Sequence, residues 1–447
     1  MIAIISLIFC LGTMFWLGLK FDLLEVICFS PAFVFCTAWF LSFSLYLTGD
    51  HFLGIETALN LSLFILAFVF PGLVLILIRN ARGGIRKEWL MTVSNFKIKP
   101  IAIALFICQS GALISAWFYL NSAIQHIGGG GVDDLVFSAA AIRGVMATEQ
   151  YDVPLFIRLL GQLKYVNYIA PVAFLALWIV RREGGWLFVL SIFLGMMSSV
   201  ILLERSGVLR LLVINVVVYI YLSTDRFRSL RNGCAILLLI FIPLVFIVPA
   251  LRGQGDEGGD NIYGYVVGGL AGINAFIEGT SGSVDILEEQ PIYVTTSGYK
   301  FGDAPIGLET ATEIYRLCNA LHVCDIPIPN GKEYIYSPIM TNIYTGLRSF
   351  YQDFGPLGMP LGVVCFSLFI HFLYLRFVSG SGVFGLFGIG YLAYVSSFMI
   401  LTNNFLFRDL IFTAVLCLVI PGLGRNKSAF WWNSRRFSSV VPGVRGS

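Results

Sequence analysis

Four arginines stand beside apolar stretches, where a guanidinium could hold an anion at the edge of a membrane. Arg143 lies in Ala-Ala-Ala-Ile-Arg-Gly-Val-Met, Arg205 in Leu-Leu-Glu-Arg-Ser-Gly, Arg252 in Pro-Ala-Leu-Arg-Gly-Gln and Arg348 in Tyr-Thr-Gly-Leu-Arg-Ser-Phe-Tyr. Arginine suits phosphate because its planar fork donates two parallel hydrogen bonds and keeps its charge. Each could instead lie along the membrane surface or pair with a carboxylate, as Arg205 could with Glu204. Together they favour a shared site for a phosphate-bearing ligand.

The segment around Arg348 combines this charge with aromatic rings. If residues 341–358 are helical, Tyr344, Arg348 and Tyr351 fall on one face, because offsets of three and four residues align on a helix. The rings could then stack on sugars while the arginine binds phosphate. The alternative is an aromatic belt at the bilayer interface, where tyrosine is common.

Several carboxylates could act as a general base on a sugar hydroxyl, namely Asp133, Asp134, Glu204 and Asp353. The sequence does not select among them. His126 and His322 are isolated histidines typical of a surface, and His371 lies within an apolar run and indicates a packed helix residue.

The elements that would position these groups are transmembrane helices. Of the 447 residues, 57% are hydrophobic and only 12% are charged, which is more apolar side chain than a soluble domain could bury. The net charge of +3 gives no indication of nucleic acid as a partner. We therefore expect an all-α polytopic membrane protein that contacts membrane lipid.

Apolar runs of about twenty residues each predict about eleven transmembrane helices, with a range of about ten to twelve. They cover residues 1–19, 25–48, 59–78, 101–122, 163–180, 186–203, 207–222, 233–250, 357–376, 383–402 and 409–424. Residues 1–250 thus form a first bundle of about eight helices, and residues 357–424 contain the last three.

Basic residues predict the orientation, because lysine and arginine are retained in cytoplasmic connections. They crowd three short connections and the tail, residues 425–447: Arg79, Arg82, Arg86, Lys87, Lys97, Lys99, Arg181, Arg182, Arg226, Arg228, Arg231, Lys427, Arg435, Arg436 and Arg445. All lie on one side if the first helix starts outside, which exports residues 123–162 and 251–356. The four arginines considered above then lie outside. Arginine is expected to be rare on that side, because the bias keeps basic residues in cytoplasmic connections.

The exported segment 251–356 is the main extramembrane mass and is acidic on balance. Within it, residues 262–279 combine small and apolar side chains. The segment is not apolar enough to cross the membrane, so we predict a helix along the membrane surface. Cys318 and Cys324 can close a small disulfide in an oxidising compartment. A metal site with His322 between them is the less favoured alternative, because no second ligand pair with zinc-like spacing accompanies it.

Four local patterns resemble the bacterial O-antigen polymerases, a family of oligosaccharide repeat-unit polymerases. They are Cys-Phe-Ser-Pro31-Ala-Phe-Val-Phe, Leu-Glu-Arg205-Ser-Gly-Val-Leu, Pro-Ala-Leu-Arg252, and Asn342-Ile-Tyr344-Thr-Gly-Leu-Arg348 continuing through Tyr351-Gln-Asp353-Phe-Gly355-Pro-Leu-Gly358. The overall layout is similar over the whole chain, but the spacing from Arg348 to Gly358 only approximates the family's arginine-to-glycine motif.

The resemblance implies a C-type glycosyltransferase of the bacterial inner membrane that works at the periplasmic face without a nucleotide sugar or a metal cofactor. Undecaprenyl-diphosphate-linked oligosaccharide would serve as both donor and acceptor, and a chain-length regulator protein is a further implied partner. Arg205, Arg252 and Arg348 would neutralise the leaving diphosphate, whose charge grows during transfer.

Other functions remain open. An O-antigen ligase shares the lipid donor and a large outer loop, but transfers glycan to lipid A core. A lipid-linked oligosaccharide flippase or other transporter usually places ionisable groups inside its spans, whereas here they lie near span ends, as Arg210 does. A scaffold protein is a further alternative.

Overall fold

The fold is described from a computed structural model. The structure describes residues 2–49, 52–81, 98–126, 142, 154–202, 204–223, 228–233, 235, 258–278, 306–326, 335–336, 340–341, 345–379, 382–400 and 407–419. These residues are helical apart from turns and one short hairpin, in which β1 (Ile335–Tyr336) pairs antiparallel with β2 (Met340–Thr341). This agrees with the predicted all-α class.

Within the described residues, six helical segments are long and apolar enough to cross a membrane. They are α1 (Ile2–Lys20), α3 (Pro31–Thr48), α4 (Ile55–Ala81), α6 (Ile98–His126), α15 (Gly346–Val378), and the run through α8 (Leu155–Gly161), η2 (Gln162–Tyr165) and α9 (Val166–Arg181). Shorter apolar helices are α10 (Gly185–Ile201), α11 (Arg205–Leu222), α16 (Gly382–Phe398), α17 (Phe407–Val419) and part of α13 (Gly258–Ile277). The chain is a multi-pass membrane protein, and the count of about eleven crossings stays a prediction.

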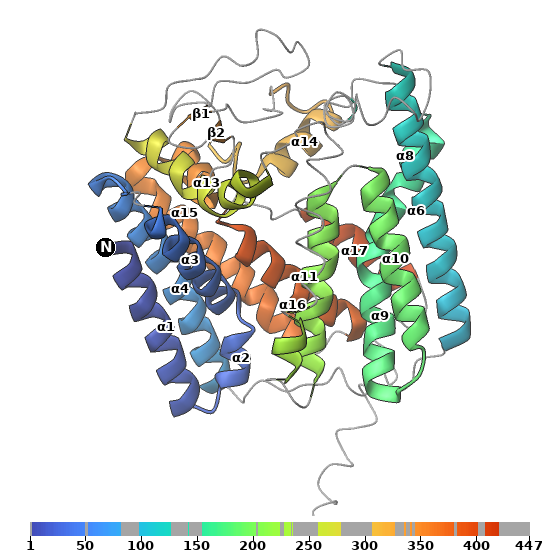
Figure 1. Ribbon diagram of the computed structural model, residues 1–447, viewed down its shortest axis with the longest axis horizontal. Coiled ribbons are helices and arrows are strands. Elements are labelled where there is room, and N and C mark those ends of the chain that lie inside the picture. The colour runs from blue at the N-terminus through green and yellow to red at the C-terminus, as the bar shows by residue number, and fades with distance from the viewer. Residues whose placement is uncertain are drawn as a thin grey trace, which may run out of the picture.

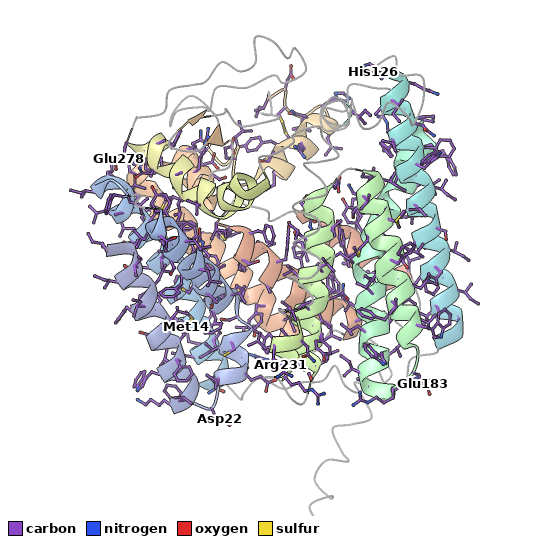
Figure 2. All side chains as sticks on the ribbon, in the orientation of Figure 1. Met14, Asp22, His126, Glu183, Arg231 and Glu278 are labelled. Atoms are coloured by element: carbon purple, nitrogen blue, oxygen red, sulfur yellow. A yellow bond between two sulfur atoms is a disulfide. The ribbon has the colours of Figure 1, made fainter. Side chains whose placement is uncertain are left out.

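The described residues differ at the two ends of the bundle (Figures 1 and 2). Asp22, Glu183 and Arg231, which mark short connections, lie at the lower end, whereas His126 and Glu278 lie at the upper end. α13, α14 (Thr312–Ala320) and the hairpin also gather at the upper end. The described helices and strands of the segment 251–356 that precede α15 therefore lie at the end opposite Asp22, Glu183 and Arg231, and the predicted orientation in the membrane stays a prediction.

The second predicted span, residues 25–48, is broken in the structure. α2 (Leu24–Cys28) ends before Ser30, and α3 starts at Pro31. The Ser30 hydroxyl accepts a hydrogen bond from Phe33 N at 3.3 Å, and proline is favoured at a first helical position because it has no N–H to satisfy. A hydropathy profile does not reveal this break, because the residues around it are mostly apolar.

α15 holds this break together from a distant part of the chain. His371 Nε2 accepts a hydrogen bond from Ala32 N at 3.2 Å, and the Tyr374 hydroxyl donates to Val26 O at 2.6 Å. His371 Nδ1 lies 2.8 Å from Ser367 O. Because a carbonyl only accepts, Nδ1 carries the proton and Nε2 is the acceptor. The neutral imidazole thus joins α15 to α3, confirming His371 as a packed helix residue.

α15 itself starts at Gly346 rather than at the predicted residue 357. Its helix is interrupted at Gly355, where φ is 67°, a value that glycine adopts without steric cost, and Pro356 follows. We call residues 346–354 the upper limb of α15. Hydropathy missed this limb because its polar side chains are buried against protein rather than lipid.

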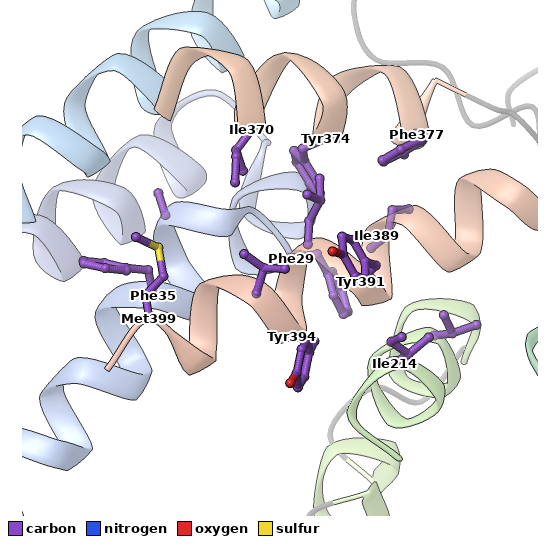
Figure 3. Close-up of a cluster of buried hydrophobic side chains, with 14 of the residues drawn as sticks. Phe29, Phe35, Ile214, Ile370, Tyr374, Phe377, Ile389, Tyr391, Tyr394 and Met399 are labelled. Carbon is purple, nitrogen blue, oxygen red and sulfur yellow. The ribbon is translucent and has the colours of Figure 1, made fainter. Parts of the chain in front are cut away.

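α16 occupies the centre of the bundle, between α15, α3, α9 and α11 (Figure 3). Nearly all of its side chains are buried, including Tyr391 and Tyr394. At Gly390 the α11 backbone comes so close that a β-carbon would lie 2.7 Å from Ile214 O. Small residues allow helices in membranes to pack at such short range.

A buried ion pair connects the middle helices. Arg210 of α11 pairs with Asp409 of α17, and its guanidinium lies 5.4 Å from the Tyr168 ring centroid and 5.2 Å from that of Tyr394. Both charges are compensated in the bundle interior, where an isolated charge would be costly. The pair therefore ties α17 to α11.

A substitution at Gly72 tests the contact between α4 and α15. A β-carbon at Gly72 would collide with the His371 ring, so Gly72→Ala is expected to destabilise the protein by about 1 to 3 kcal/mol. Gly12→Ala on α1 makes the same change with nothing within 4 Å and should not destabilise it. Thermal unfolding in detergent compares them, and equal loss in both variants would contradict this account of the packing.

The His371 bridge can be tested in the same assay. His371→Leu removes the acceptor for the Ala32 N–H and should cost about 1 to 3 kcal/mol, because a buried donor is left unsatisfied. His371→Gln keeps an acceptor oxygen and should lose less. Unchanged melting of the Leu variant would show that the bridge contributes nothing.

Candidate functional site

The candidate site lies where α13 crosses the upper limb of α15 (Figure 1). The surface helix predicted over residues 262–279 is present as α13, which packs on α3 and α4. Val267, Leu270 and Ile273 are fully buried. α13 therefore covers the upper end of the bundle as a docked element.

Arg348 is the centre of the site. Only 1% of its surface is exposed, and its Nε donates to Gln352 Oε1 at 3.0 Å. Its guanidinium lies 4.7 Å from the Phe276 ring centroid of α13, a cation–π distance. The Tyr351 ring meets the same Phe276 ring edge-on at 6.2 Å. Arg348 and Tyr351 thus share one face of a helix, as the spacing predicts for this pair.

A glutamate that the sequence did not single out joins this group. The Tyr351 hydroxyl donates to Glu56 Oε1 at 3.4 Å, and Glu56 is an exposed residue in the first turn of α4. Arg348, Phe276, Tyr351 and Glu56 therefore form a continuous row of contacts, which we call the Arg348 row.

Asn274 of α13 and Glu278, the residue directly after α13, fix the start of α4. Asn274 Oδ1 accepts from Gly54 N at 2.8 Å, and Glu278 Oε1 accepts from the Thr57 N–H at 3.1 Å and from its hydroxyl at 3.0 Å. These carboxylate and amide oxygens satisfy N–H groups at a helix start. The position of Glu56 is thus set by the docking of α13.

Asp353 was a candidate general base, but both of its carboxylate oxygens accept hydrogen bonds from the backbone. Its Oδ1 accepts from Glu309 N at 3.0 Å and its Oδ2 from Thr310 N at 2.7 Å, so both oxygens hold the turn that precedes α14. Cys318 and Cys324 are joined by the disulfide that the sequence left open, with Cα atoms 5.5 Å apart. Asp353 and the disulfide together define a compact unit, residues 306–326.

The structure brings together only part of the predicted site. Arg348, Tyr351 and Asp353 lie on the upper limb of α15. Arg205 starts α11, but its side chain is outside the described residues, as are Arg143, Arg252, Tyr344, Asp133 and Asp134 in full. Glu204 is the residue before α11. The described residues contain no cluster of three or more His, Cys, Asp or Glu side chains suited to a metal ion.

The hold of Asp353 on the unit 306–326 can be tested by proteolysis. Asp353→Ala removes the acceptors of two backbone N–H groups, so the unit should loosen and trypsin should cleave faster after the exposed Arg316. Asp325→Ala removes an exposed carboxylate of the same unit and serves as the control. Equal cleavage of wild type and Asp353→Ala would refute the holding role.

The chain matches no protein-family model, no curated protein and no solved structure. The function is therefore inferred from the residues of the site and from the geometry that holds them.

Proposed function

We propose that this protein is a glycosyltransferase that polymerises lipid-diphosphate-linked oligosaccharide repeat units into O-antigen or a related surface polysaccharide. The observation that carries the proposal is the burial of Arg348 against the Phe276 ring, which in turn meets the Tyr351 ring, at the end of the bundle where α13 and α14 lie.

The chemistry of transfer fits a buried guanidinium. As the bond to the anomeric carbon breaks, negative charge grows on the leaving diphosphate, and a donor held in place beforehand stabilises that charge. Burial lowers the local dielectric and strengthens the attraction. The described contacts of Arg348 include a neutral amide oxygen and a ring face, which a diphosphate oxygen can join or replace.

The position of the site also fits a lipid-linked substrate. The membrane part of α15 follows the upper limb directly after Gly355, so Arg348 lies near the level of the lipid head groups. There the diphosphate of an undecaprenyl lipid would lie beside the protein, with its sugars toward the unit 306–326. Since the Phe276 ring covers the guanidinium, the diphosphate would reach Arg348 when that ring turns aside.

The proposal places this end at the periplasmic face of a bacterial inner membrane, an orientation that the positive-inside bias supports. No nucleotide sugar or metal is needed for this reaction, and a chain-length regulator would act as a protein partner.

Buried ionisable groups in the spans give less support to a transporter. Arg210 is paired with Asp409, and His371 bridges two helices. These bonds join helices and leave the groups in structural roles, whereas a transport path would use them for substrate or protons.

Deletion of the gene in the strain that carries it tests the proposal, with the surface glycan ladder read on a gel. A core bearing a single repeat unit supports a polymerase. Loss of even that unit would favour a ligase or a flippase, and an unchanged ladder would contradict all three functions.

Variants of Arg348, expressed in the deletion strain, test whether this residue is needed for polymer formation. Arg348→Ala should abolish polymer, and Arg348→Lys should restore little, because an ammonium lacks the planar fork. Arg376→Ala, at the opposite end of α15, is the control. Immunoblots of membrane fractions check insertion, and full polymer from inserted Arg348→Ala would exclude the role.

A further inference from the structure

We infer that Glu56 is the general base of the transfer, accepting the proton of the acceptor sugar hydroxyl; this rests on the proposed glycosyltransferase function. The inference comes from the bonding of the carboxylates that the structure places around Arg348.

Four carboxylates adjoin the upper limb of α15 and the docked α13 in the described part of the chain. Glu309 lies in the turn that Asp353 holds, beside the Asp353 carboxylate rather than in the Arg348 row. Both oxygens of Asp353 accept backbone N–H groups, and Glu278 Oε1 accepts two hydrogen bonds from Thr57. Those two carboxylates hold the structure together. Glu56 is exposed, and its side chain accepts a hydrogen bond from the hydroxyl of Tyr351.

The Tyr351 hydroxyl marks where a sugar hydroxyl would bind. It is a neutral O–H donor at 3.4 Å from Glu56 Oε1, a long contact that a better-placed hydroxyl can replace. A carboxylate that accepts a hydrogen bond from a hydroxyl is positioned to take its proton as the oxygen attacks. The tyrosine ring next to it offers a face for the acceptor sugar.

The Arg348 row places this base and the anion site at its two ends. Phe276 contacts the guanidinium with its face and meets Tyr351 edge-on, and Tyr351 reaches Glu56. The backbone of each end is fixed, because Glu56 O accepts from the Asn60 amide within α4 and Arg348 is buried within α15. The acceptor hydroxyl at Glu56 and the donor diphosphate at Arg348 would thus meet over the aromatic pair.

Glu56 and Arg348 account for the proton and the leaving group of the glycosyl transfer. The acceptor oxygen forms a bond to the anomeric carbon of the donor, and its proton passes to the Glu56 carboxylate. The bond from that carbon to the diphosphate oxygen breaks, and its electron pair leaves with the diphosphate, which Arg348 stabilises. The proton on Glu56 then returns to solvent.

Glu56→Gln and Glu183→Gln make the same change at two exposed glutamates. Glu56→Gln keeps an acceptor oxygen, so the bond to Tyr351 can persist, whereas Glu183 lies at the lower end of the bundle, away from the Arg348 row. In the complemented deletion strain, we expect Glu56→Gln to lower polymer formation per membrane-inserted protein by about 100-fold or more. Glu183→Gln should stay near wild type, and Glu56→Asp, which restores a carboxylate, should recover part of the activity.

Three results would overturn the inference: near-normal polymer from Glu56→Gln, equal loss from Glu183→Gln, or failure of Glu56→Gln to insert, which would make Glu56 structural. The deletion strain separates this from the proposed function. If deletion leaves the ladder unchanged, the polymerase itself is excluded; if deletion removes polymer and Glu56→Gln restores it, only the base is wrongly assigned.

Discussion

The structure depends on one constraint, that a helix start covered by other parts of the protein cannot leave its first N–H groups without acceptors. Where water does not reach these groups, side chains from distant segments accept their hydrogen bonds. His371 receives the N–H of Ala32 at the start of α3, and Asn274 and Glu278 receive those at the start of α4. Asp353 does the same outside the spans, for the turn before α14.

These acceptors come from α13 and α15, the same two helices that carry the candidate site. Because Asn274 and Glu278 fix α13 on α4, Phe276 is held over Arg348. Because His371 fixes the lower part of α15, the upper limb has a rigid base. The bonds that complete the helix starts therefore also determine where the guanidinium and the aromatic rings lie.

Features that repeat along the chain could be predicted from the sequence. Hydropathy located most of the described helices, and the spacing of Arg348 and Tyr351 placed them on one face. Contacts between distant residues could not be predicted. Thr57 and Glu278 are 221 residues apart, so nothing local marks Glu278 as a helix cap or places Glu56 beside Tyr351.

The pair of Arg210 and Asp409 has a consequence for how the chain is made. Its members are 199 residues apart, so α11 leaves the ribosome long before α17 exists. At ordinary synthesis rates that interval is roughly 10 to 40 s. During it, Arg210 lacks this partner, but its position near the N-terminal end of α11 lets the side chain extend toward the head groups, where a charge costs less than at the centre of a span. The ion pair that ties α11 to α17 therefore forms late, after α13, α15 and α16 have been made.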